Sequence, residues 1–542
     1  MMQQHWWQSA TVYQIYPRSF QDSNGDGIGD IPGIISRLDY LAALGVDALW
    51  LSPVYKSPNA DNGYDIADYQ AIDPAYGTMA DMDQLIVQAA RHGMKIIMDL
   101  VVNHTSDEHP WFVSARQDPR SSTHNYYVWA DAVNGQVPNE LTSGFIGGSA
   151  WQYEKQTDQY FLHLFSEKQV DLNWQNPDLR RAIYQMMNFW IDKGIEGFRM
   201  DVVDMLAKEP LKKILVNGPH LHEYLHEMNR QTWRDRDFLT VGEAWSASPE
   251  DALQYSDERR EELSMIFQFG HLWADRRVGG EKWEQRPLDV AQLKQALSAC
   301  QTKMANHGWN SLFWNNHDLP RVVSRFGATG KYRELSAKML AMTLHGLKGT
   351  PFIYQGEEIG MTDCPVTTID QVNDVEARTI YRQLRAQGED DRAAIQKINV
   401  FNRDNARTPM QWNQMPQAGF TTGQPWLAVN PNYSTINATT AQANRQSLWW
   451  TYQRLIALRK QSPVLQQGDF AELVAVPTPV FAYTRTWQQD QWLICSNFSG
   501  EQVTVDLPKR AAKLIMSNYQ DYPAQLGRIE LRPYEAFILA LC

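Results

Sequence analysis

The chain has 542 residues and a net charge of −12, with 43% hydrophobic and 21% charged residues, as expected of a globular protein with more than one domain. It contains no long basic run and no uninterrupted apolar run of 18 residues, so we expect neither a nucleic-acid partner nor a membrane span. The first residues lack the regions of a signal peptide, and the four cysteines share no short spacing. We therefore expect a monomer in the reducing cytoplasm, free of zinc sites and disulfides.

The first predicted strand, at residues 11–17, is followed by the loop "QDSNGDGIGD" at 21–30. Side-chain oxygens separated by glycines are the pattern with which a chain wraps Ca²⁺. The twelfth position, where an EF-hand carries a bidentate glutamate, is Gly33, so the loop is not an EF-hand. We expect a structural calcium ion, with Mg²⁺ as the substitute, and the alternative is an Asx-turn loop without metal. The side chains concerned are Asp22, Asn24, Asp26 and Asp30.

Short apolar or β-branched runs alternate with amphipathic helical patterns along most of the chain. Repetition of strand, helix and strand implies parallel pairing, and eight repeats over some 450 residues predict a closed (β/α)₈ TIM barrel of the α/β class. The predicted strands are residues 11–17, 48–54, 95–102, 197–203, 238–245, 263–269, 310–318 and 350–358. The predicted helices between them include residues 34–44, 79–92, 179–193 and 333–345.

Two segments depart from this repetition. The stretch after the third strand is long, aromatic and rich in loops, which predicts an inserted subdomain at 104–172. After a helical pattern at 445–461 the chain changes to alternating residues and turn signals, which predicts a C-terminal antiparallel β-domain at 465–542. The barrel would then consist of residues 1–103 and 173–464.

Ionisable residues recur where the predicted strands end, and barrel active sites lie at that edge. A single aspartate after a strand is usually a turn or a helix cap, but several on one rim indicate a site. Two carboxyl groups, one ionised and one protonated, suit hydrolysis of a glycosidic bond. Arg199 on the same strand face as Asp201 would favour the ionised form there, and apolar neighbours would raise the pKa of Glu243. The rim residues are Asn103, His104, Arg199, Asp201, Glu243, His317, Asp318, Glu357 and Glu358.

Four motifs resemble the α-amylase superfamily, glycoside hydrolase family 13: "DLVVNH" (99–104), "GFRMDVVDM" (197–205), "VGEAW" (241–245) and "FWNNHD" (313–318). Within it, "DNGYDI", "RDNARTPMQW" and "QVDLN" resemble the oligo-1,6-glucosidase subfamily. The runs "HWWQSATVYQIYPRSF" and "GKYRELSAK" are most similar to bacterial glucan 1,6-α-glucosidases, or dextran glucosidases. One departure is Val170, where the subfamily has proline.

The resemblance implies a retaining, exo-acting hydrolase that releases α-glucose from the non-reducing ends of α-1,6-linked gluco-oligosaccharides. It makes Asp201 the nucleophile, Glu243 the general acid/base and Asp318 the stabiliser of the transition state. Arg403 would pair with Asp61 and close the pocket behind the terminal glucose. The pocket would be lined by Asp61, Tyr64, His104, Arg199, His317 and Arg403, and the Ile28 carbonyl would join Asp22, Asn24, Asp26 and Asp30 around calcium.

Choice of glycosidic link is expected to depend on three further residues implied by the resemblance. Val202 after the nucleophile accompanies α-1,6 activity, although it could be an ordinary strand residue. Lys282 and Glu376 would reach the second and later sugars, although Lys282 could equally be a solvated charge. The alternatives on the same fold are a general α-1,4-glucosidase and a trehalose-6-phosphate hydrolase, which needs a cationic patch that the sequence does not reveal. A non-catalytic, transporter-associated relative is disfavoured because all three acids are present and no anchor is visible.

Overall fold

The computed structural model describes residues 5–144, 147–277, 279–519 and 526–541. Its centre is a sheet of eight parallel strands in the order β13-β12-β11-β5-β2-β1-β15-β14. Ser311 Oγ on β14 donates a hydrogen bond to the Ile266 carbonyl on β13 at 2.8 Å, so the two ends of the sheet meet. The strands are β1 (Val12–Ile15), β2 (Ala48–Leu51), β5 (Lys95–Leu100), β11 (Gly197–Met200), β12 (Leu239–Glu243), β13 (Met265–Phe267), β14 (Ser311–Leu312) and β15 (Thr350–Tyr354).

This topology confirms the predicted (β/α)₈ barrel, and each strand lies within its predicted run. Runs such as "ALWL" on β2 are buried along their whole length, as expected of parallel strands covered on both faces. Several predicted runs are longer than the strands. β14 stops at Leu312 because the chain turns, and the Asn316 side chain accepts a hydrogen bond from the Asp318 N–H at 2.8 Å.

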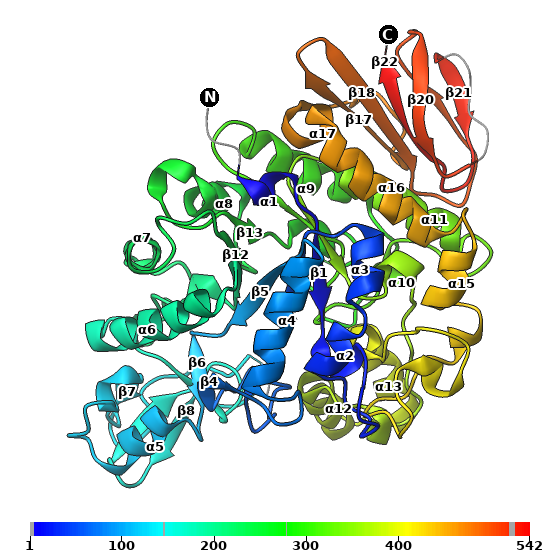
Figure 1. The fold of residues 1–542 in the computed structure, drawn as a ribbon. Helices are drawn as coiled ribbons and strands as arrows, with labels where there is room; N and C mark the ends of the chain where they lie inside the picture. Colours follow the sequence, from blue (N-terminus) through cyan, green and yellow to red (C-terminus); the bar gives the residue numbers. More distant parts are fainter. Residues whose placement is uncertain (1–4, 145–146, 278, 520–525, 542) are drawn as a thin grey trace.

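Helices surround the barrel (Figure 1). α6 shows why they form where they do: Asn176 caps its start, Pro177 occupies the first turn, and Gly194 ends it with a φ of 102°. The pattern at 333–345 is helix α11, whereas the pattern at 34–44 is divided into two helices. The main helices are α2 (Ile31–Ile35), α3 (Leu38–Leu44), α4 (Met79–Arg91), α6 (Pro177–Lys193), α7 (Leu221–Gln231), α8 (Pro249–Ser256), α9 (Val290–Lys303), α11 (Arg333–His345) and α16 (Leu448–Gln461).

An inserted subdomain follows β5. β6 (His104–Ser106) pairs antiparallel with β10 (Gln169–Asp171), so the chain leaves and returns to the barrel along one two-stranded ribbon. Between them lie α5 (Pro110–Gln117) and a three-stranded sheet of β7 (Trp129–Ala130), β9 (Gln159–Leu162) and β8 (Trp151–Glu154). Its aromatic content is used in packing, because Phe112 contacts the rings of Tyr127, Trp129 and Phe161.

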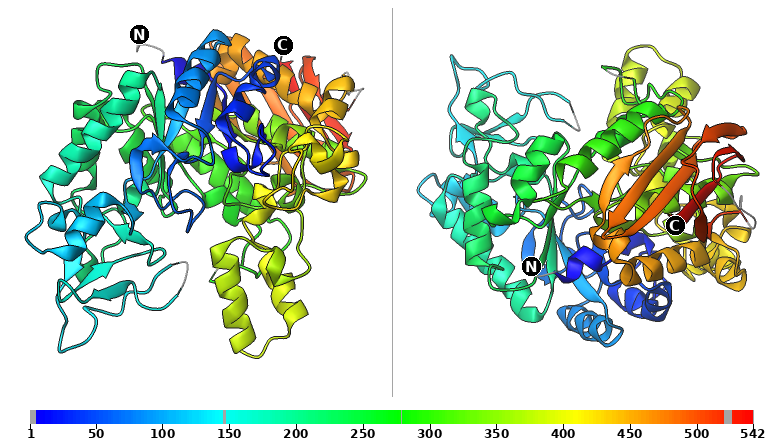
Figure 2. Two further views of the ribbon diagram at one scale, coloured as in Figure 1. Left: turned by 60° about the horizontal axis from the view of Figure 1, so that its bottom comes forward. Right: turned by 90° about the horizontal axis from the view of Figure 1, so that it is seen from above.

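A pair of helices, α12 (Val375–Ala386) and α13 (Asp391–Asn399), follows β15 and was not predicted from the sequence. We call it the α12–α13 hairpin. Figure 2 shows it projecting from the barrel on the side on which the inserted subdomain also projects. It has a small apolar cluster of its own, built on Val372, Ala377, Ile395, Ile398 and Phe401.

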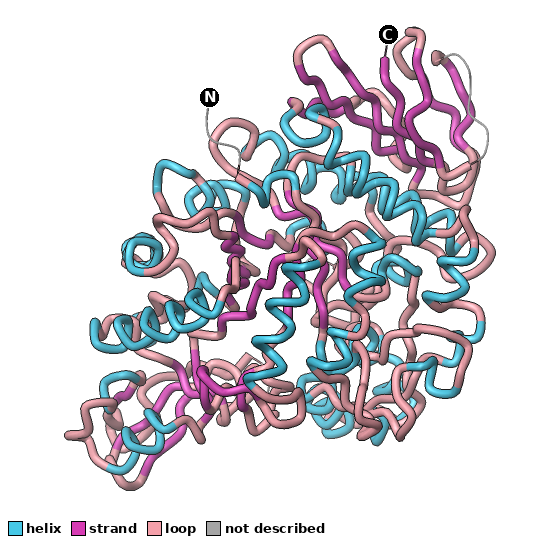
Figure 3. Tube along the Cα trace, in the orientation of Figure 1, coloured by secondary structure: helices cyan, strands magenta, loops and turns pink. Residues whose placement is uncertain are grey.

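A five-stranded antiparallel sheet completes the fold, as predicted, and Figure 3 shows it beside the barrel helices. Tyr483 Oη donates to the Thr343 carbonyl of α11 at 2.6 Å, so this sheet packs on the barrel. Its strands are β16 (Asp469–Glu472), β17 (Val480–Trp487), β18 (Asp490–Asn497), β22 (Ala536–Leu541) and β20 (Ala512–Ser517), with β19 (Val503–Asp506) and β21 (Arg528–Leu531) paired nearby. The division at 103/104, 172/173 and 464/465 stays a proposal, and α17 (Pro463–Gln467) spans the last of these boundaries.

No helix among the described residues is both long enough and apolar enough to cross a membrane.

Candidate active site

Arg199 stands at the centre of the carboxyl-end rim and is fully buried. Its Nη1 lies 2.8 Å from Asp99 Oδ1 and 2.9 Å from Asp201 Oδ1, and its Nη2 lies 2.7 Å from Glu243 Oε2. Asp99 lies near the end of β5, Asp201 directly follows β11 and Glu243 ends β12, and these three strands are neighbours in the barrel. One guanidinium therefore holds three carboxyl groups, of which Asp99 was not predicted although its motif was identified.

The pKa values of Asp201 and Glu243 are both raised. Burial is the main cause for each, and Arg199 opposes it. For Asp201 the negative charge of Glu243 adds to the rise. Arg199 favours the ionised form of Asp201 as expected, but burial outweighs it there, and Arg199 contacts Glu243 as well. The pair as a whole is thus prepared to retain a proton, while Glu243 Oε1 is buried and has no hydrogen-bond partner among the described residues.

Val202 has an unusual backbone, with φ 35° and ψ 49°. A β-branched residue in the left-handed region is a strained conformation, and such strain concentrates at functional sites. This conformation directs the Val202 N–H to Glu243 Oε2 at 3.3 Å. The residue after Asp201 is therefore part of a tight turn and not of the strand, since β11 ends at Met200.

Asp318 lies opposite, surrounded by positive charge. Arg407 Nη2 is 2.7 Å and Arg403 Nη1 is 3.4 Å from Asp318 Oδ1. Burial would raise the pKa of Asp318, but His317, Arg407 and Arg403 outweigh it and hold the pKa well below the usual range. The Asp318 carboxylate is therefore ionised at any working pH, in contrast to the Asp201 and Glu243 pair.

The aromatic rings of Tyr64, His317 and His104 lie beside these acids. The Tyr64 and His317 rings are parallel, 5.3 Å apart, and Tyr64 Oη lies 2.6 Å from His317 Nε2. His104 Nε2 is 3.0 Å from the Tyr64 carbonyl. Burial lowers the pKa of His104 to about 4 and that of His317 to about 3, so both rings are neutral at neutral pH.

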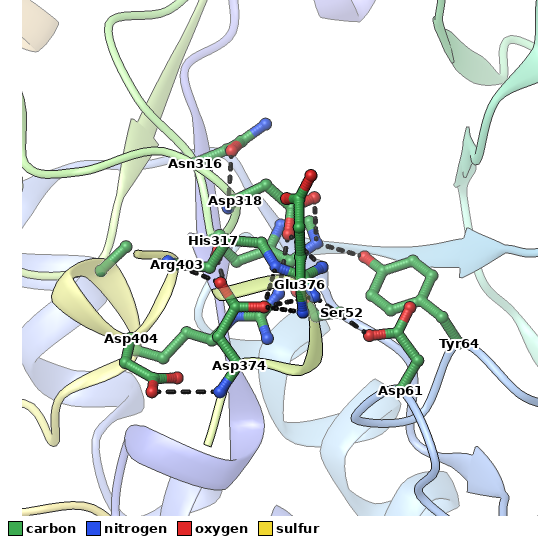
Figure 4. A network of polar contacts seen from close by, with 12 residues as sticks. Ser52, Asp61, Tyr64, Asn316, His317, Asp318, Asp374, Glu376, Arg403 and Asp404 are labelled. Atoms are coloured by element: carbon green, nitrogen blue, oxygen red, sulfur yellow. Dashed lines mark hydrogen bonds and ion pairs between the residues drawn. The ribbon is translucent and has the colours of Figure 1, made fainter. Parts of the chain in front are cut away.

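Arg403 and Asp61 meet as expected, at 3.4 Å between Nη2 and Oδ1. Figure 4 shows Arg403 between Asp61, Asp318 and Asp374. Gln169, not predicted, donates to Asp61 Oδ2 at 3.3 Å. It lies in the "QVDLN" motif that the sequence displayed, whereas no sequence signal pointed to Asp374.

Most of the predicted catalytic and pocket residues line a cavity of about 350 Å³ that continues into a second one of about 440 Å³, but Arg199 and His317 are fully buried and line neither. We call these cavities the inner and outer lobes. The inner lobe is lined by residues that include Asp61, Tyr64, His104, Asp201, Val202, Glu243, Asp318 and Arg403. Lys282 and Glu376 line both lobes and are bonded to each other, so the structure brings these two residues together at the junction.

Glu357 and Glu358 do not reach this cleft. Glu357 accepts a hydrogen bond from Tyr452 Oη at 2.6 Å, and Glu358 accepts from Tyr13 and Tyr40 at 2.9 and 2.7 Å. The expectation that they belong to the rim is wrong. The chain turns through Gly356, with φ 86°, directly after β15, and the two carboxyls are fully buried beneath the barrel helices.

The predicted calcium loop is closed by its own hydrogen bonds. Asp22 accepts from the N–H groups of Asn24, Gly25 and Gly27 at 2.7–2.9 Å, and Asp26 accepts from Ile28 at 2.8 Å. Asp30 accepts from Ser23 and Gly33. A carboxylate oxygen keeps a second lone pair for a cation, so the donor chemistry fits Ca²⁺. No group of three or more His, Cys, Asp or Glu side chains in the described part of the chain is placed to hold a metal, and calcium stays a prediction.

Comparisons with known proteins find similarity along most or all of the chain. A family model for the catalytic domain of α-amylase matches residues 14–468, and one for the C-terminal domain of the α-amylase SusG matches residues 480–538. A glucan 1,6-alpha-glucosidase of Streptococcus pneumoniae is 53% identical and an oligo-1,6-glucosidase of Bacillus cereus 48% identical, each covering 100% of both chains.

Solved structures are similar over the same length. A trehalose-6-phosphate hydrolase of Bacillus licheniformis superimposes with a TM-score of 0.96 at 43% identity, covering 99% of this chain and 100% of that one. A trehalulose synthase of Pseudomonas mesoacidophila superimposes with a TM-score of 0.95 at 39% identity, covering 100% of both chains.

Proposed function

The chain belongs to the α-amylase family, and from this premise we propose that it is an exo-acting glucan 1,6-α-glucosidase. It hydrolyses isomalto-oligosaccharides from their non-reducing ends. The observation that carries this assignment is full-length similarity, at 53% identity, to a glucan 1,6-alpha-glucosidase. The family and the class of enzyme expected from the sequence motifs are thereby confirmed.

Hydrolysis would proceed by double displacement with retention. Asp201 attacks the anomeric carbon of the terminal glucose, and the bond from that carbon to the glycosidic oxygen breaks as Glu243 donates a proton to the oxygen. Water, deprotonated by Glu243, then attacks the glucosyl ester and releases α-glucose and free Asp201. Support for these roles comes from the shared contact of both carboxyls with Arg199 and from the pKa of Glu243, which is raised chiefly by burial.

Exo-action would follow from the closed end of the inner lobe. Arg403 contacts both Asp61 and Asp318 at 3.4 Å, so a charged bridge stands behind the position proposed for the terminal glucose. A glucan chain would have no path past this bridge, and only its non-reducing end would enter. Asp318, held ionised by its arginine neighbours, would stabilise the positive charge of the oxocarbenium-like transition state.

Trehalose 6-phosphate is the second candidate substrate, because one similar structure is a hydrolase of it. The outer lobe does contain Arg276, Arg277 and Lys282, a cationic group that the sequence did not reveal. Each of these cations has an acidic neighbour, however: Asp275 at 3.6 Å, Glu284 at 3.5 Å and Glu376 respectively. A phosphate would have to displace these acids, which favours a neutral gluco-oligosaccharide.

A hydrolysis panel tests the assignment. Isomaltose, isomaltotriose and panose should be cleaved, with kcat/KM for isomaltotriose at least roughly tenfold above that for maltotriose, about 1.4 kcal/mol of transition-state discrimination. Proton NMR should show α-glucose before its anomers equilibrate. Preference for maltotriose would indicate a general α-glucosidase, preference for trehalose 6-phosphate the phosphosugar hydrolase, and β-glucose as first product would overturn the retaining mechanism.

We propose further that the enzyme acts as a monomer in the cytoplasm, on oligosaccharides and without nucleic-acid or membrane partners. Among the described residues the thiols of Cys300, Cys364 and Cys495 are free, which suits a reducing compartment. The net charge of −12 disfavours binding to nucleic acid.

A further inference from the structure

Asp374 holds Arg403 more closely than Asp61 or Asp318 does. Arg403 Nη2 lies 2.7 Å from Asp374 Oδ1, Arg403 Nε donates to the same oxygen at 2.9 Å, and the Arg403 N–H donates to Asp374 Oδ2 at 3.1 Å. Asp61 and Asp318 are each 3.4 Å from Arg403. Side chain and backbone of Arg403 are therefore both fixed by one aspartate, as Figure 4 shows.

The same aspartate begins the α12–α13 hairpin. Asp374 is the N-cap of α12, and its Oδ1 accepts a hydrogen bond from the Glu376 N–H at 3.1 Å. The Asp374 N–H in turn donates to Asp404 Oδ2 at 3.1 Å. Glu376, in the first turn of α12, forms an ion pair with Lys282 at the junction of the two lobes. Asp374 thus contacts two residues, Arg403 and Glu376, that both line the inner and the outer lobe.

Because both groups are buried, Arg403 depends strongly on Asp374. Asp374 is fully buried and lines neither lobe, so it is not placed to touch a sugar. A buried guanidinium needs a charged partner, and removal of one partner leaves the other uncompensated. Without Asp374, Arg403 would keep its longer contacts with Asp61 and Asp318, and its side chain would turn toward them. Charge-assisted bonds made through two nitrogens also fix orientation, which a single longer contact does not.

We propose that Asp374 is a positioning residue for both lobes: it orients Arg403 beside the reacting glucose and, as the cap of α12, places Glu376 beside the departing sugar. The inference rests on the proposed α-glucosidase function. It predicts that two properties, reactivity toward any α-glucoside and preference for longer substrates, can be separated by substitutions at one position.

The variants Asp374→Asn and Asp374→Ala separate reactivity toward any α-glucoside from the preference for longer substrates. Asparagine keeps a cap oxygen for α12 but loses the charge that orients Arg403. We expect kcat/KM to fall by roughly 30- to 100-fold on both 4-nitrophenyl α-glucoside and isomaltotriose, since a misplacement of about 1 Å has an effect of this order. Alanine removes the cap as well, so isomaltotriose should lose about fivefold more than the aryl glucoside, the equivalent of a cap of about 1 kcal/mol.

Asp390 provides the matched control, because it caps α13 in the same hairpin by accepting from the Ala393 N–H at 2.8 Å. The kcat/KM of Asp390→Ala should stay within about twofold of the wild type on both substrates. This loss is smaller than the one expected when the cap at Asp374 is removed. A double-mutant cycle distinguishes orientation of Arg403 by Asp374 from a merely structural role of Asp374. In an Arg403→Ala background, Asp374→Asn should cause no further loss on the aryl glucoside, because the two residues act as a unit.

Three results would overturn the inference. The first is a kcat/KM of Asp374→Asn within about threefold of the wild type on the aryl glucoside, and the second is that Asp374→Asn causes the same loss in the Arg403→Ala background as in the wild type. The third is an Asp390→Ala enzyme as impaired as Asp374→Ala. Melting curves establish that each variant is folded, and Asp374→Ser, which also provides a cap oxygen, replaces the asparagine variant if that one is not. A wild-type enzyme inactive on the aryl α-glucoside would instead contradict the proposed function.

Discussion

At the scale of single residues, Arg199 holds the two central carboxyls together but does not explain how they differ. It contacts Asp201 at 2.9 Å and Glu243 at 2.7 Å, so its charge alone does not distinguish nucleophile from acid. What distinguishes them is the surroundings of the second oxygen: Glu243 Oε1 is buried without a hydrogen-bond partner among the described residues. An oxygen of this kind is suited to carry the proton, because Arg199 and the Val202 N–H both contact the other oxygen, Oε2.

Substitution separates the two roles. Asp201→Ala should lower kcat by several orders of magnitude on every substrate, since the covalent step is lost. Glu243→Gln should be severely impaired on isomaltotriose but less impaired in the glycosylation step with an activated aryl glucoside, whose leaving group needs little protonation. Pre-steady-state measurement of that step checks the difference. Equal losses of the glycosylation rate on both substrates would remove Glu243 from the role of acid.

Val202 is the residue on which the choice of link is expected to depend. Its side chain lines the inner lobe while its backbone is strained at φ 35°, so branched bulk is held at a fixed place beside Asp201. A 1,6-link adds a rotatable bond, and the next sugar leaves the pocket along a different path. Val202→Thr or Val202→Ala should narrow the preference for isomaltotriose over maltotriose, chiefly by raising activity on maltotriose.

Val203 is the control for this prediction, because it is fully buried next along the chain and lines neither lobe. Val203→Ala should lower the melting temperature through a core cavity and leave the ratio of the two kcat/KM values unchanged. If both Val202 variants keep the wild-type ratio, linkage choice depends on another part of the cleft.

At the scale of elements, the helices and strands that have a clear hydrophobic periodicity could be predicted from the sequence. α11 has the predicted bounds at 333–345, and every barrel strand lies inside a predicted run. The α12–α13 hairpin was not predicted although both helices are amphipathic, and its apolar residues form a small cluster of their own. Asp374 was missed because its partner Arg403 is 29 residues away, and only the folded hairpin brings them together.

The loop after β1 is predicted to bind Ca²⁺, and thermal melting tests whether it does. Added Ca²⁺ should raise the melting temperature of the wild type, because a ligand bound only by the folded state stabilises it, by about 2.7 kcal/mol at a hundredfold excess over Kd. Asp22→Ala combined with Asp26→Ala should lower the melting temperature and abolish this dependence, while activity at low temperature survives.

Asp22→Ala also removes hydrogen bonds to three backbone N–H groups, so a lower melting temperature alone does not demonstrate metal. The response to Ca²⁺ is the decisive measurement. Protein without metal by elemental analysis, and with no response of its melting temperature to Ca²⁺ or Mg²⁺, would establish the loop as an Asx turn.

At the scale of the whole molecule, a second set of acids affects stability and not catalysis. Glu357 and Glu358 are buried, in contact with tyrosines from β1, α3 and α16, so they join segments from both ends of the barrel sequence. Sequence patterns placed them with the catalytic acids because both sets follow a strand. The direction in which the chain turned after β15 was decided by packing, which no pattern in the sequence displays.

Burial raises the pKa of Glu357 from its ordinary value of 4.5 to about 8. Between these two pH values the folded protein keeps a proton that the unfolded chain releases, so the free energy of unfolding falls as pH rises. The contribution is complete below about pH 4.5 and is lost as the pH rises to about 8, at a rate of at most about 1.4 kcal/mol per pH unit.

Glu357→Gln removes this titration while its amide oxygen can still accept the Tyr452 hydroxyl. Near pH 5 the melting temperatures of variant and wild type should be similar, and near pH 8.5 the variant should melt roughly 2–5 °C higher. Other buried acids titrate equally in both proteins and cancel in the difference. Glu281→Gln, at an exposed glutamate, should follow the wild type at every pH. An identical pH dependence in Glu357→Gln and wild type would mean that Glu357 is ionised in the folded protein, and that its contact with Tyr452 outweighs burial.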